Sequence, residues 1–183
     1  WEDRPVLSEE PAFNLDVKYA GETVASKLAR IREEMKEAGT NVHVVSTIDD
    51  ICWTLNIRGN DIDFFPLVLS YGIITMDSFE LYIDEKKLDD KLKAKLAKDG
   101  VNLHPYNDIY EDVKKFGSDV VAMIDPGKLN YALFNNIPEN VKTVEKRNPA
   151  ILMKAIKNPV EIENIRKAQI KDSVAHVRFM KWL

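Results

Sequence analysis

The sequence is poor in residues that build covalent cross-links. Its 183 residues include one cysteine, Cys52, so no disulfide can form within the chain. Cys52 lies between Ile51 and Trp53 in an apolar run and has no paired histidine, which indicates a buried structural thiol rather than a nucleophile. The lack of disulfides fits a reducing compartment, and we therefore expect a cytoplasmic protein.

Histidine and glycine are also scarce. The three histidines, His43, His104 and His176, fall in different expected elements, and none forms the closely spaced pair that a zinc site uses. The seven glycines are scattered singly, so there is no glycine-rich phosphate loop and no Gly-x-Ser-x-Gly nucleophile elbow. The sequence therefore predicts no catalytic residue and no metal site within this chain.

The chain has no surplus of positive charge and no long apolar run. It carries 26 basic and 30 acidic residues, so nothing favours nucleic acid as a partner, because phosphate binding needs surplus Lys and Arg. No apolar run approaches the roughly 20 residues that cross a bilayer, and no signal-peptide pattern opens the chain. The first residue is Trp1 rather than Met, and Leu183 lies inside an expected helix, so we expect a piece of a longer protein.

Apolar patterning predicts alternating helices and strands. Residues 1–19 carry prolines and turn formers, and we interpret them as a linker strapped to the surface, with Trp1 and Phe13 as anchors. Residues 20–148 then alternate stripes of helical period with short β-branched runs. We expect helices around 24–38, 49–55, 88–99, 107–116 and 131–134, with Asn107 as an N-cap, and strands around 41–46, 67–75, 79–83, 101–104, 120–124 and 141–144. The alternation and one hairpin predict an α/β fold with a mixed sheet flanked by helices.

A domain boundary is expected near Pro149, so that residues 149–183 begin a further domain. Asn158, Pro159 and Glu161 form the sequence pattern of a capped helix start with a capping box. The apolar positions of the helix that follows exceed what one packing face needs. We therefore expect this helix to dock on a further domain, or on a second copy of the chain in a homodimer.

The carboxylates suggest helix capping rather than acid–base chemistry. Two adjacent pairs open expected helices, where negative charge suits the helix dipole. These pairs are Asp49-Asp50 and Asp89-Asp90. Asp61 and Asp63 lie instead in a polar loop with Arg58, but they offer too few oxygens at the required spacing for a calcium site.

Three stretches resemble one enzyme family. The opening Trp1-Glu-Asp-Arg-Pro is similar to the Trp-x-Asp-Arg-Pro that opens the middle domain of three-domain Xaa-Pro aminopeptidases (aminopeptidase P). The run from Asp49 to Asp61 is similar to that domain's Asp-Glu-Ile-Ala-Trp-Leu-Phe-Asn-Leu-Arg-Gly-x-Asp, and Pro66, Ser70 and Tyr71 match its continuation. The stretch Lys154-Ala-Ile-Lys-Asn158, with Glu161, Glu163, Ile165, Arg166 and Ala168 after it, resembles the beginning of the catalytic domain; Gln169 departs from the His that relatives often carry.

The resemblance implies a fold like the creatinase amino-terminal domain. It also implies a longer parent enzyme that removes the first residue from peptides with proline second. In that family two Asp, one His and two Glu of the following domain hold two divalent metals, usually Mn²⁺, that activate a water. None of those five ligands falls in this chain. The resemblance therefore implies a fragment that is inactive alone and has no cofactor, with the catalytic domain of the same parent as its partner.

The role that remains for such a domain is to wall the substrate cleft and limit access to it. We expect the loop over residues 56–63 to face the cleft, with Arg58, Asn60, Asp61 and Tyr71 as candidate substrate-cleft residues. Arg58 could instead serve as a structural tie between the loop and Asp61 or Asp63.

Two other interpretations stay open. Creatinase-like domains also occur in histone chaperones, where they bind protein partners without catalysis. A small-molecule binding domain is the third interpretation, and it would require a closed pocket.

Overall fold

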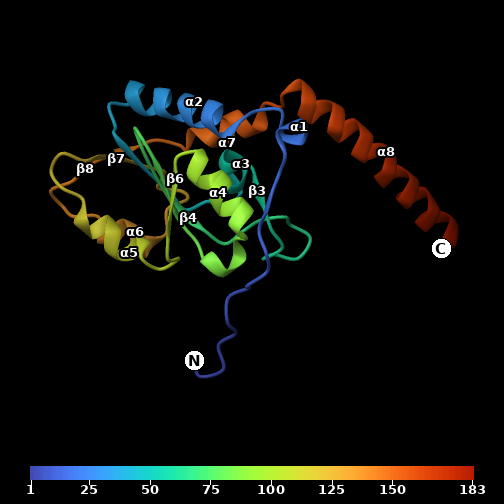
Figure 1. The fold of residues 1–183 in the computed structure, drawn as a ribbon, viewed down its shortest axis with the longest axis horizontal. Coiled ribbons are helices and arrows are strands. Elements are labelled where there is room, and N and C mark those ends of the chain that lie inside the picture. Colours follow the sequence, from blue (N-terminus) through green and yellow to red (C-terminus); the bar gives the residue numbers. More distant parts are fainter.

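A six-stranded mixed sheet forms the centre of the structure (Figure 1). The computed structural model describes every residue from Trp1 to Leu183. The strand order across the sheet is β6-β5-β4-β2-β7-β8, and a separate two-stranded pair joins β1 to β3. The strands are β1 (Phe13–Asn14), β2 (Val42–Val45), β3 (Ile57–Arg58), β4 (Tyr71–Thr75), β5 (Phe79–Tyr82), β6 (Val101–His104), β7 (Val121–Ile124) and β8 (Lys142–Glu145).

All strands of the large sheet except β4 run in one direction. β2 is parallel to β7, β7 to β8, and β5 to β6, whereas β4 is antiparallel to both β2 and β5. The C-terminal ends of the co-directional strands therefore meet at one edge of the sheet, the edge where β4 begins with Tyr71. This topology confirms the expected mixed sheet and the expected hairpin, in which Ile74 of β4 opposes Phe79 of β5.

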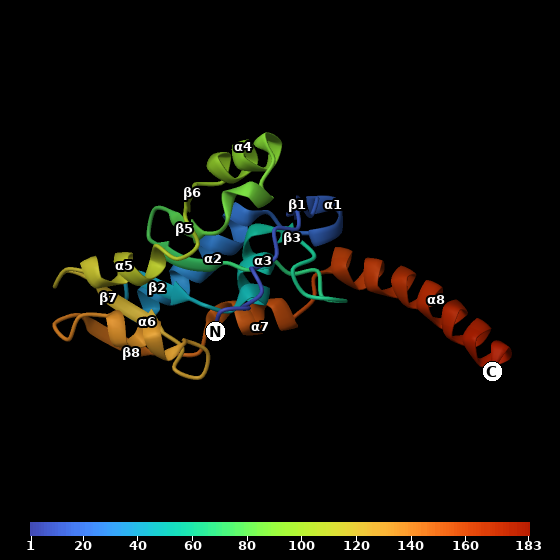
Figure 2. The same cartoon turned by 90° about the horizontal axis from the view of Figure 1, so that it is seen from below.

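Helices cover both faces of the sheet (Figures 1 and 2). Side chains from α2, α3, α4 and α7 share the larger buried cluster with one face, while α5 and α6 share the smaller cluster with the other. The α-helices are α1 (Val17–Ala20), α2 (Val24–Glu37), α3 (Ile48–Leu55), α4 (Asp90–Lys98), α5 (Ile109–Asp112), α6 (Tyr131–Asn136), α7 (Pro149–Ala155) and α8 (Pro159–Trp182), with short 3₁₀ helices η1 (Glu85–Lys87) and η2 (Val113–Lys115).

Local sequence accounts for α2. Its stripe of Val24, Leu28, Ile31 and Met35 is buried, as the spacing predicts. The Thr23 side chain accepts a hydrogen bond from the Ser26 amide at the first turn. The helix is followed by Gly39 at a φ of +67°, which is the expected left-handed residue after a helix.

The strand expected over 67–75 begins later than predicted. Residues 67–70 are irregular because their amides serve the preceding loop: Leu67 N–H donates to Phe65 O and Leu69 N–H donates to the Asp61 carboxylate. The ladder of β4 can therefore start only at Tyr71.

The structure also corrects the expected cap of α5. The residue before α5 is Asp108 rather than Asn107, and its side chain makes no capping hydrogen bond. Asn107 lies in the preceding turn, where its carbonyl accepts a hydrogen bond from Tyr110 N–H.

The N-terminal strap is anchored differently from the prediction. Trp1 is 89% exposed, because no part of the domain lies beside it, so its expected anchoring role within this chain is wrong. The attachment is made by the backbone: Ala12 N–H donates to Lys87 O, and Phe13 pairs with Arg58 between β1 and β3. The Phe13 ring itself is about half exposed, at 48%.

The C-terminal region divides into a docked helix and a projecting one. α7 packs on α2 and α3, and its Ala150 is buried in the main cluster. α8 begins with the expected capping box between Asn158 and Glu161 and then extends away from the body with no buried residue (Figure 1). The predicted division of the longer protein at Pro149 stays a prediction. No helix combines the length and the apolarity that a membrane span requires.

Candidate functional site

Arg58 lies on β3 directly after α3. Its Nη1 donates to Cys52 O and Ile57 O, both at 2.8 Å. Asn56, in the left-handed region with a φ of 52°, ends α3 and turns the chain so that Arg58 folds back on it. Burial lowers the pKa of Arg58 from its usual value. The ion pair expected as one alternative, from Arg58 to a loop aspartate, is wrong, because the guanidinium donates instead to Cys52 O in α3 and to Ile57 O in β3.

Asp61 anchors the base of the loop between β3 and β4. Its Oδ2 accepts hydrogen bonds from Lys87 Nζ and from Leu69 N–H, each at 2.6 Å. The Asp61 and Lys87 side chains are only 1% and 2% exposed, so this is a buried ion pair. Removing one partner of such a pair typically costs about 3–5 kcal/mol, because the other charge stays buried and uncompensated. The loop is therefore held rigidly at its base.

Asn60 and Gly59 complete the exposed side of this loop. Asn60 is exposed and its side chain makes no hydrogen bond within the chain. A Cβ at Gly59 would lie 2.7 Å from a methyl carbon of Val68, so only glycine fits this close approach. Of the four sequence-predicted cleft residues, Asn60 alone is both polar and free to contact a ligand directly.

Tyr71 belongs to a cluster of three tyrosines at the edge where β4 begins. Its hydroxyl lies 3.1 Å from that of Tyr110, and its ring centroid is 5.0 Å from that of Tyr106. Burial raises the pKa of Tyr71, and it raises the pKa of Tyr110 to about 12. All three phenols therefore stay neutral at physiological pH and act as hydrogen-bonding, apolar surfaces.

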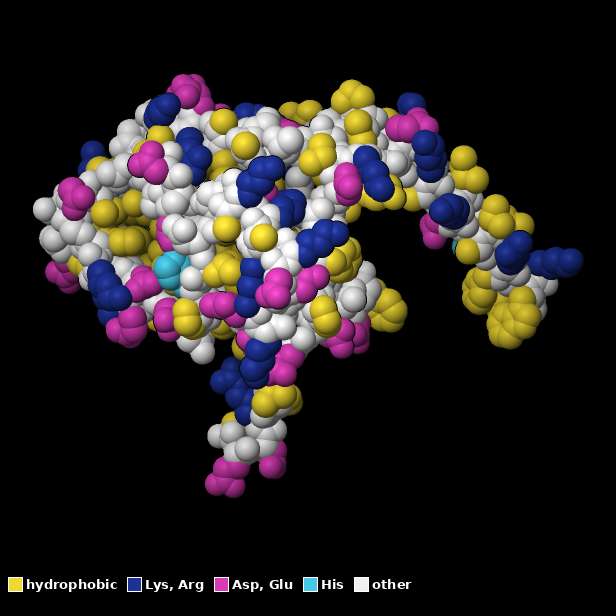
Figure 3. Space-filling model, viewed as in Figure 1, with side chains coloured by type: hydrophobic (Ala, Val, Ile, Leu, Met, Phe, Trp, Pro, Cys, Tyr) yellow, Lys and Arg dark blue, Asp and Glu magenta, His cyan; other side chains and the backbone are white.

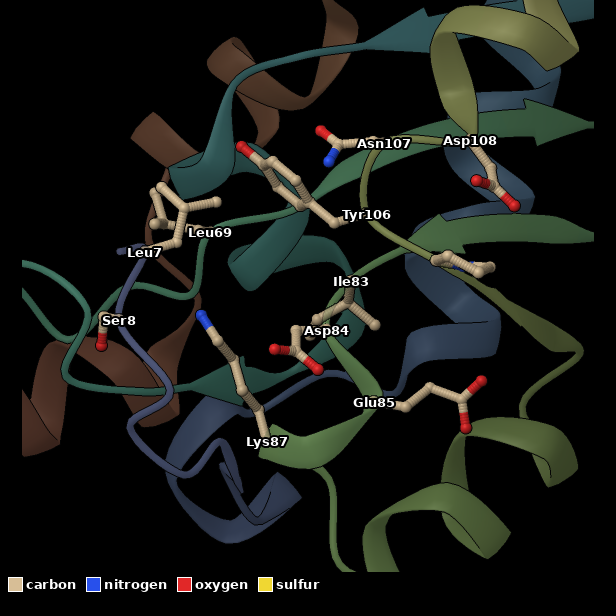
Figure 4. Close-up of a pocket in the computed structure, with 11 residues that line it drawn as sticks. Leu7, Ser8, Leu69, Ile83, Asp84, Glu85, Lys87, Tyr106, Asn107 and Asp108 are labelled. Atoms are coloured by element: carbon tan, nitrogen blue, oxygen red, sulfur yellow. The ribbon is translucent and has the colours of Figure 1, made fainter. Parts of the chain in front are cut away.

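A pocket of about 490 Å³ connects the buried ion pair with the tyrosine cluster. Figure 4 shows Asp84 and Lys87 of the segment after β5 around it, together with Leu69 from before β4 and Tyr106 from after β6, and with Leu7 of the strap on one side. The segments that follow β5 and β6 form its walls, so it lies at the C-terminal edge of the sheet, where α/β folds commonly bind ligands.

A second polar centre fastens α7 to the sheet. Asn148 Nδ2 donates to Asp50 Oδ2 at 2.9 Å, while Lys154 Nζ donates to Asp50 Oδ1 at 2.7 Å and also to Asp49. His43 lies between two acceptors, with Met123 O 3.0 Å from Nδ1 and Asn148 Oδ1 3.2 Å from Nε2. A neutral imidazole ring can donate a hydrogen bond to only one of these two oxygens. Burial nevertheless favours the neutral ring, because it lowers the pKa of His43.

A third centre joins α2 to α3 and, beside it, α1 to α8. Lys27 Nζ donates to Trp53 O at 2.7 Å and to Asn56 Oδ1 at 2.6 Å, and it lies 4.3 Å from the centroid of the Trp53 ring. Burial lowers the pKa of Lys27 to about 8. Beside it, Asn158 Nδ2 donates to Ala20 O at 2.8 Å, which holds the start of α8 against α1.

The structure brings some predicted residues together and separates others. Asp61 and Tyr71 both border the pocket region, through Lys87 and Tyr106, whereas Arg58 is turned toward the end of α3. Sequence reasoning missed Lys87, Tyr106 and Asn148. Lys87 sits in the charged run Asp-Glu-Lys-Lys, which is typical of a solvated turn, and only its partner Asp61 explains its burial.

None of these centres forms a hydrolytic site. No group of three or more His, Cys, Asp or Glu side chains is arranged to hold a metal ion. Cys52 is buried, and burial raises the pKa of its thiol to about 11, so it stays protonated and inert. The arrangement can position loops and present surfaces, which are the capabilities of a binding or bounding domain.

Comparison with known proteins identifies the class. The creatinase/prolidase N-terminal domain family matches residues 3–161, and the chain belongs to that family. The chain is similar along its whole length to the X-prolyl aminopeptidase of Caenorhabditis elegans, described as a cytosolic enzyme with a di-nuclear active site, with a TM-score of 0.93 at 34% identity and coverage of 31% of that chain.

Curated relatives agree on the same kind of protein. The chain is 38% identical over 185 residues to Xaa-Pro aminopeptidase 1 of Dictyostelium discoideum and 36% identical over 193 residues to a probable Xaa-Pro aminopeptidase P of Neurospora crassa. It is fully covered in both matches but spans only 29% and 28% of those proteins. A Bacillus anthracis Xaa-Pro dipeptidase, with a TM-score of 0.61 at 16% identity, shares the fold. The family and the fold predicted from sequence are confirmed.

Proposed function

We propose that this chain is the non-catalytic middle domain of a longer Xaa-Pro aminopeptidase, which removes the first residue from peptides with proline second. The observation that carries the proposal is the match of the whole chain to less than a third of proteins named as such enzymes. The alternative of a histone chaperone domain is not favoured, because the similar proteins are aminopeptidases. A cytoplasmic location is part of the proposal, supported by the cytosolic C. elegans relative.

The residues of this chain do not fit the metals of such an enzyme. No cluster of potential ligands exists here, so the two divalent ions, which we propose to be Mn²⁺, belong to the remainder of the longer protein. In this proposal the present chain supplies no ligand, nucleophile or base. It forms a wall beside the bound peptide and a rigid attachment for the catalytic domain.

The proposed wall is the loop between β3 and β4 with its supports. Asn60 is the side chain available for direct contact with a peptide, since Asp61 pairs with Lys87 and Arg58 donates to the carbonyls of Cys52 and Ile57. Tyr71 contributes through the tyrosine cluster. Arg58 and Asp61 would thus shape the cleft by fixing the loop, rather than by binding substrate.

The first experiment compares the chain 1–183 with the longer protein. Both are incubated with an Xaa-Pro peptide and Mn²⁺, with the corresponding Xaa-Ala peptide as control. We expect turnover of the Xaa-Pro peptide by the longer protein alone. Turnover by purified 1–183 would refute the non-catalytic role, and failure of the longer protein to cleave either peptide would refute the proposed activity.

The second experiment tests the wall with a matched pair of exposed asparagines. In the longer protein we expect Asn60→Ala to lower kcat/KM by roughly 2–10-fold, the loss of one hydrogen bond of about 0.5–1.5 kcal/mol, without changing the melting temperature. Asn135→Ala on α6, equally exposed, should change neither quantity. Arg58→Ala should instead lower the melting temperature, because the carbonyls of Cys52 in α3 and Ile57 in β3 lose their donor. Identical kinetics for Asn60→Ala and Asn135→Ala would remove Asn60 from the cleft.

A further inference from the structure

The outer end of the loop between β3 and β4 carries an apolar turn that nothing in this chain covers. Ile62, Phe64 and Phe65 are all exposed, and the Phe64 ring is fully so. Single exposed apolar residues are ordinary, but clustered large ones mark interaction sites. We call residues 62–65 the aromatic tip.

The backbone of the aromatic tip is strained in a way that its sequence does not relieve. Phe65 N–H donates to Ile62 O at 3.1 Å and closes a tight turn. Phe64 occupies the third position of this turn with a φ of 65°. Glycine or asparagine adopts that conformation easily, whereas a bulky residue there destabilises the folded turn. The tip therefore combines backbone strain with a hydrated ring, and both are typical of a surface that meets a partner.

The tip is presented on a rigid base. Asp61 N–H donates to Leu67 O, and the Asp61 carboxylate binds Leu69 N–H and the Lys87 ammonium. These contacts fix both strands of the loop immediately below the turn. Binding at the tip would thus lose little conformational entropy, which favours a specific contact.

The aromatic tip and α8 lie on the same side of the molecule. In Figures 1 and 2 the loop after β3 projects from the body on the side toward which α8 extends. Figure 3 shows hydrophobic side chains on both projections, with a hollow between them. Large apolar side chains are exposed along the length of α8, including Ile170, Val174 and Val177.

We propose that the aromatic tip and α8 form two sides of a single docking site. We propose that the domain that follows α8 in the longer protein occupies this site. The proposal rests on the proposed function, in which such a domain exists. More than two thirds of each similar aminopeptidase lies outside the part that this chain matches. A domain joined to the end of α8 starts beside the hollow, so covering the tip requires no long connection.

The test uses cysteine labelling of the longer protein. Phe64→Cys and, separately, Phe65→Cys are treated with a maleimide, and the modified peptide is identified by mass spectrometry. The matched control is Tyr131→Cys on α6, an exposed aromatic position on the far side of the sheet. Cys52 does not interfere, because it is buried. We expect at least tenfold slower modification at 64 and 65 than at 131.

Three outcomes would overturn the proposal. The first is equal labelling at 64, 65 and 131. The second is protection at the tip that disappears on dilution, which would identify a second copy of the chain as the occupant. The third is protection that appears only with added Xaa-Pro peptide, which would identify the tip as a substrate contact. Peptidase activity is measured on the same samples. An inactive protein with a protected tip would refute the proposed function but would still support the proposed docking site.

A functional variant gives an independent readout. Phe64→Gly removes the ring and relieves the strained backbone, so it should not destabilise the domain itself. In the longer protein it should still raise the rate of tryptic cleavage at Lys157, between α7 and α8, by about fivefold or more, because the following domain is held less firmly. Tyr131→Gly should not raise this rate. Unchanged cleavage in Phe64→Gly would contradict the docking role.

Discussion

Replacing Gly21 with alanine should uncouple α8 from the body of the domain. Gly21 ends α1 with a φ of +71°, and a Cβ there would overlap Asn158 Oδ1 and lie 2.7 Å from Asn158 Cγ. The Asn158 side chain cannot move aside freely. Its Oδ1 accepts the Glu161 amide at 2.9 Å and its Nδ2 donates to Ala20 O at 2.8 Å. The added methyl group would therefore disrupt both the N-cap of α8 and the hydrogen bond that links α8 to α1.

The magnitude follows from three contributions. Placing alanine at a left-handed φ costs about 1 kcal/mol. Loss of the N-cap bond costs about 1 kcal/mol, and loss of the hydrogen bond to Ala20 costs about 1 kcal/mol. Gly21→Ala should therefore lower the free energy of unfolding by about 3 kcal/mol. Because α8 has no buried residue, the part of the loss that comes from the clash with Asn158 cannot exceed the free energy that holds α8 to α1, and beyond that limit the helix detaches.

Gly39→Ala is the matched control. Gly39 has a φ of +67°, but a Cβ there would meet nothing within 4 Å, so only the backbone cost of about 1 kcal/mol applies. Urea unfolding followed by circular dichroism measures both variants, and tryptic cleavage at Lys157 reports detachment of α8. In an Asn158→Ala background, Gly21→Ala should cost only about 1 kcal/mol, a coupling of about 2 kcal/mol. Equal losses for Gly21→Ala and Gly39→Ala would refute the proposed steric coupling.

Two further predictions concern the polar centres. Lys27 has its pKa lowered to about 8 by burial, so the folded chain binds fewer protons than the unfolded chain between pH 8 and the usual pKa of 10.5, and stability rises with pH across that window. From pH 8 to 10 the free energy of unfolding should rise by about 2 kcal/mol more in the native chain than in Lys27→Met. The exposed Lys36→Met is the control. Parallel pH profiles for the native chain and Lys27→Met would contradict the lowered pKa of Lys27. Asn148→Ala should cost about 3 kcal/mol in urea unfolding, because Asp50 and His43 lose a buried partner and α7 loses its cap. Asn130→Ala removes only the cap of α6 and should cost about 1 kcal/mol; equal losses would mean that the Asn148 network contributes nothing beyond capping.

Features that depend on neighbouring residues could be predicted from the sequence. The stripe of α2 follows from helical spacing, and the α8 capping box follows from the identities of Asn158 and Glu161. The hairpin of β4 and β5 follows from two apolar runs around Asp77-Ser78. Each of these signals lies within one element or across one turn, where period and capping chemistry decide the structure.

Features that depend on distant polar partners could not be predicted. Lys87 lies in a charged run of the kind typical of solvated turns, yet it is buried in an ion pair with Asp61, 26 positions earlier. The same pairing uses the amide of Leu69 and delays the start of β4. The loop expected over residues 56–63 includes a short strand, because Arg58 lies on β3, and nothing in the local sequence indicates that its guanidinium folds back onto α3. Such pairings have no period, and many carboxylates in the chain could have served equally well.

The polar centres together set the direction of α8. On one side of the connector, Lys154 is held by Asp49 and Asp50, and Asn148 locks the start of α7 to the sheet. On the other side, Asn158 is held by Ala20 O and by the Glu161 amide. Only residues 156–158 lie between the two helices. Hydrogen bonds are directional whereas apolar burial is not, so this junction fixes an angle rather than merely an attachment. The proposed docking of a following domain on the aromatic tip requires that fixed angle, and the polar residues at the junction provide it.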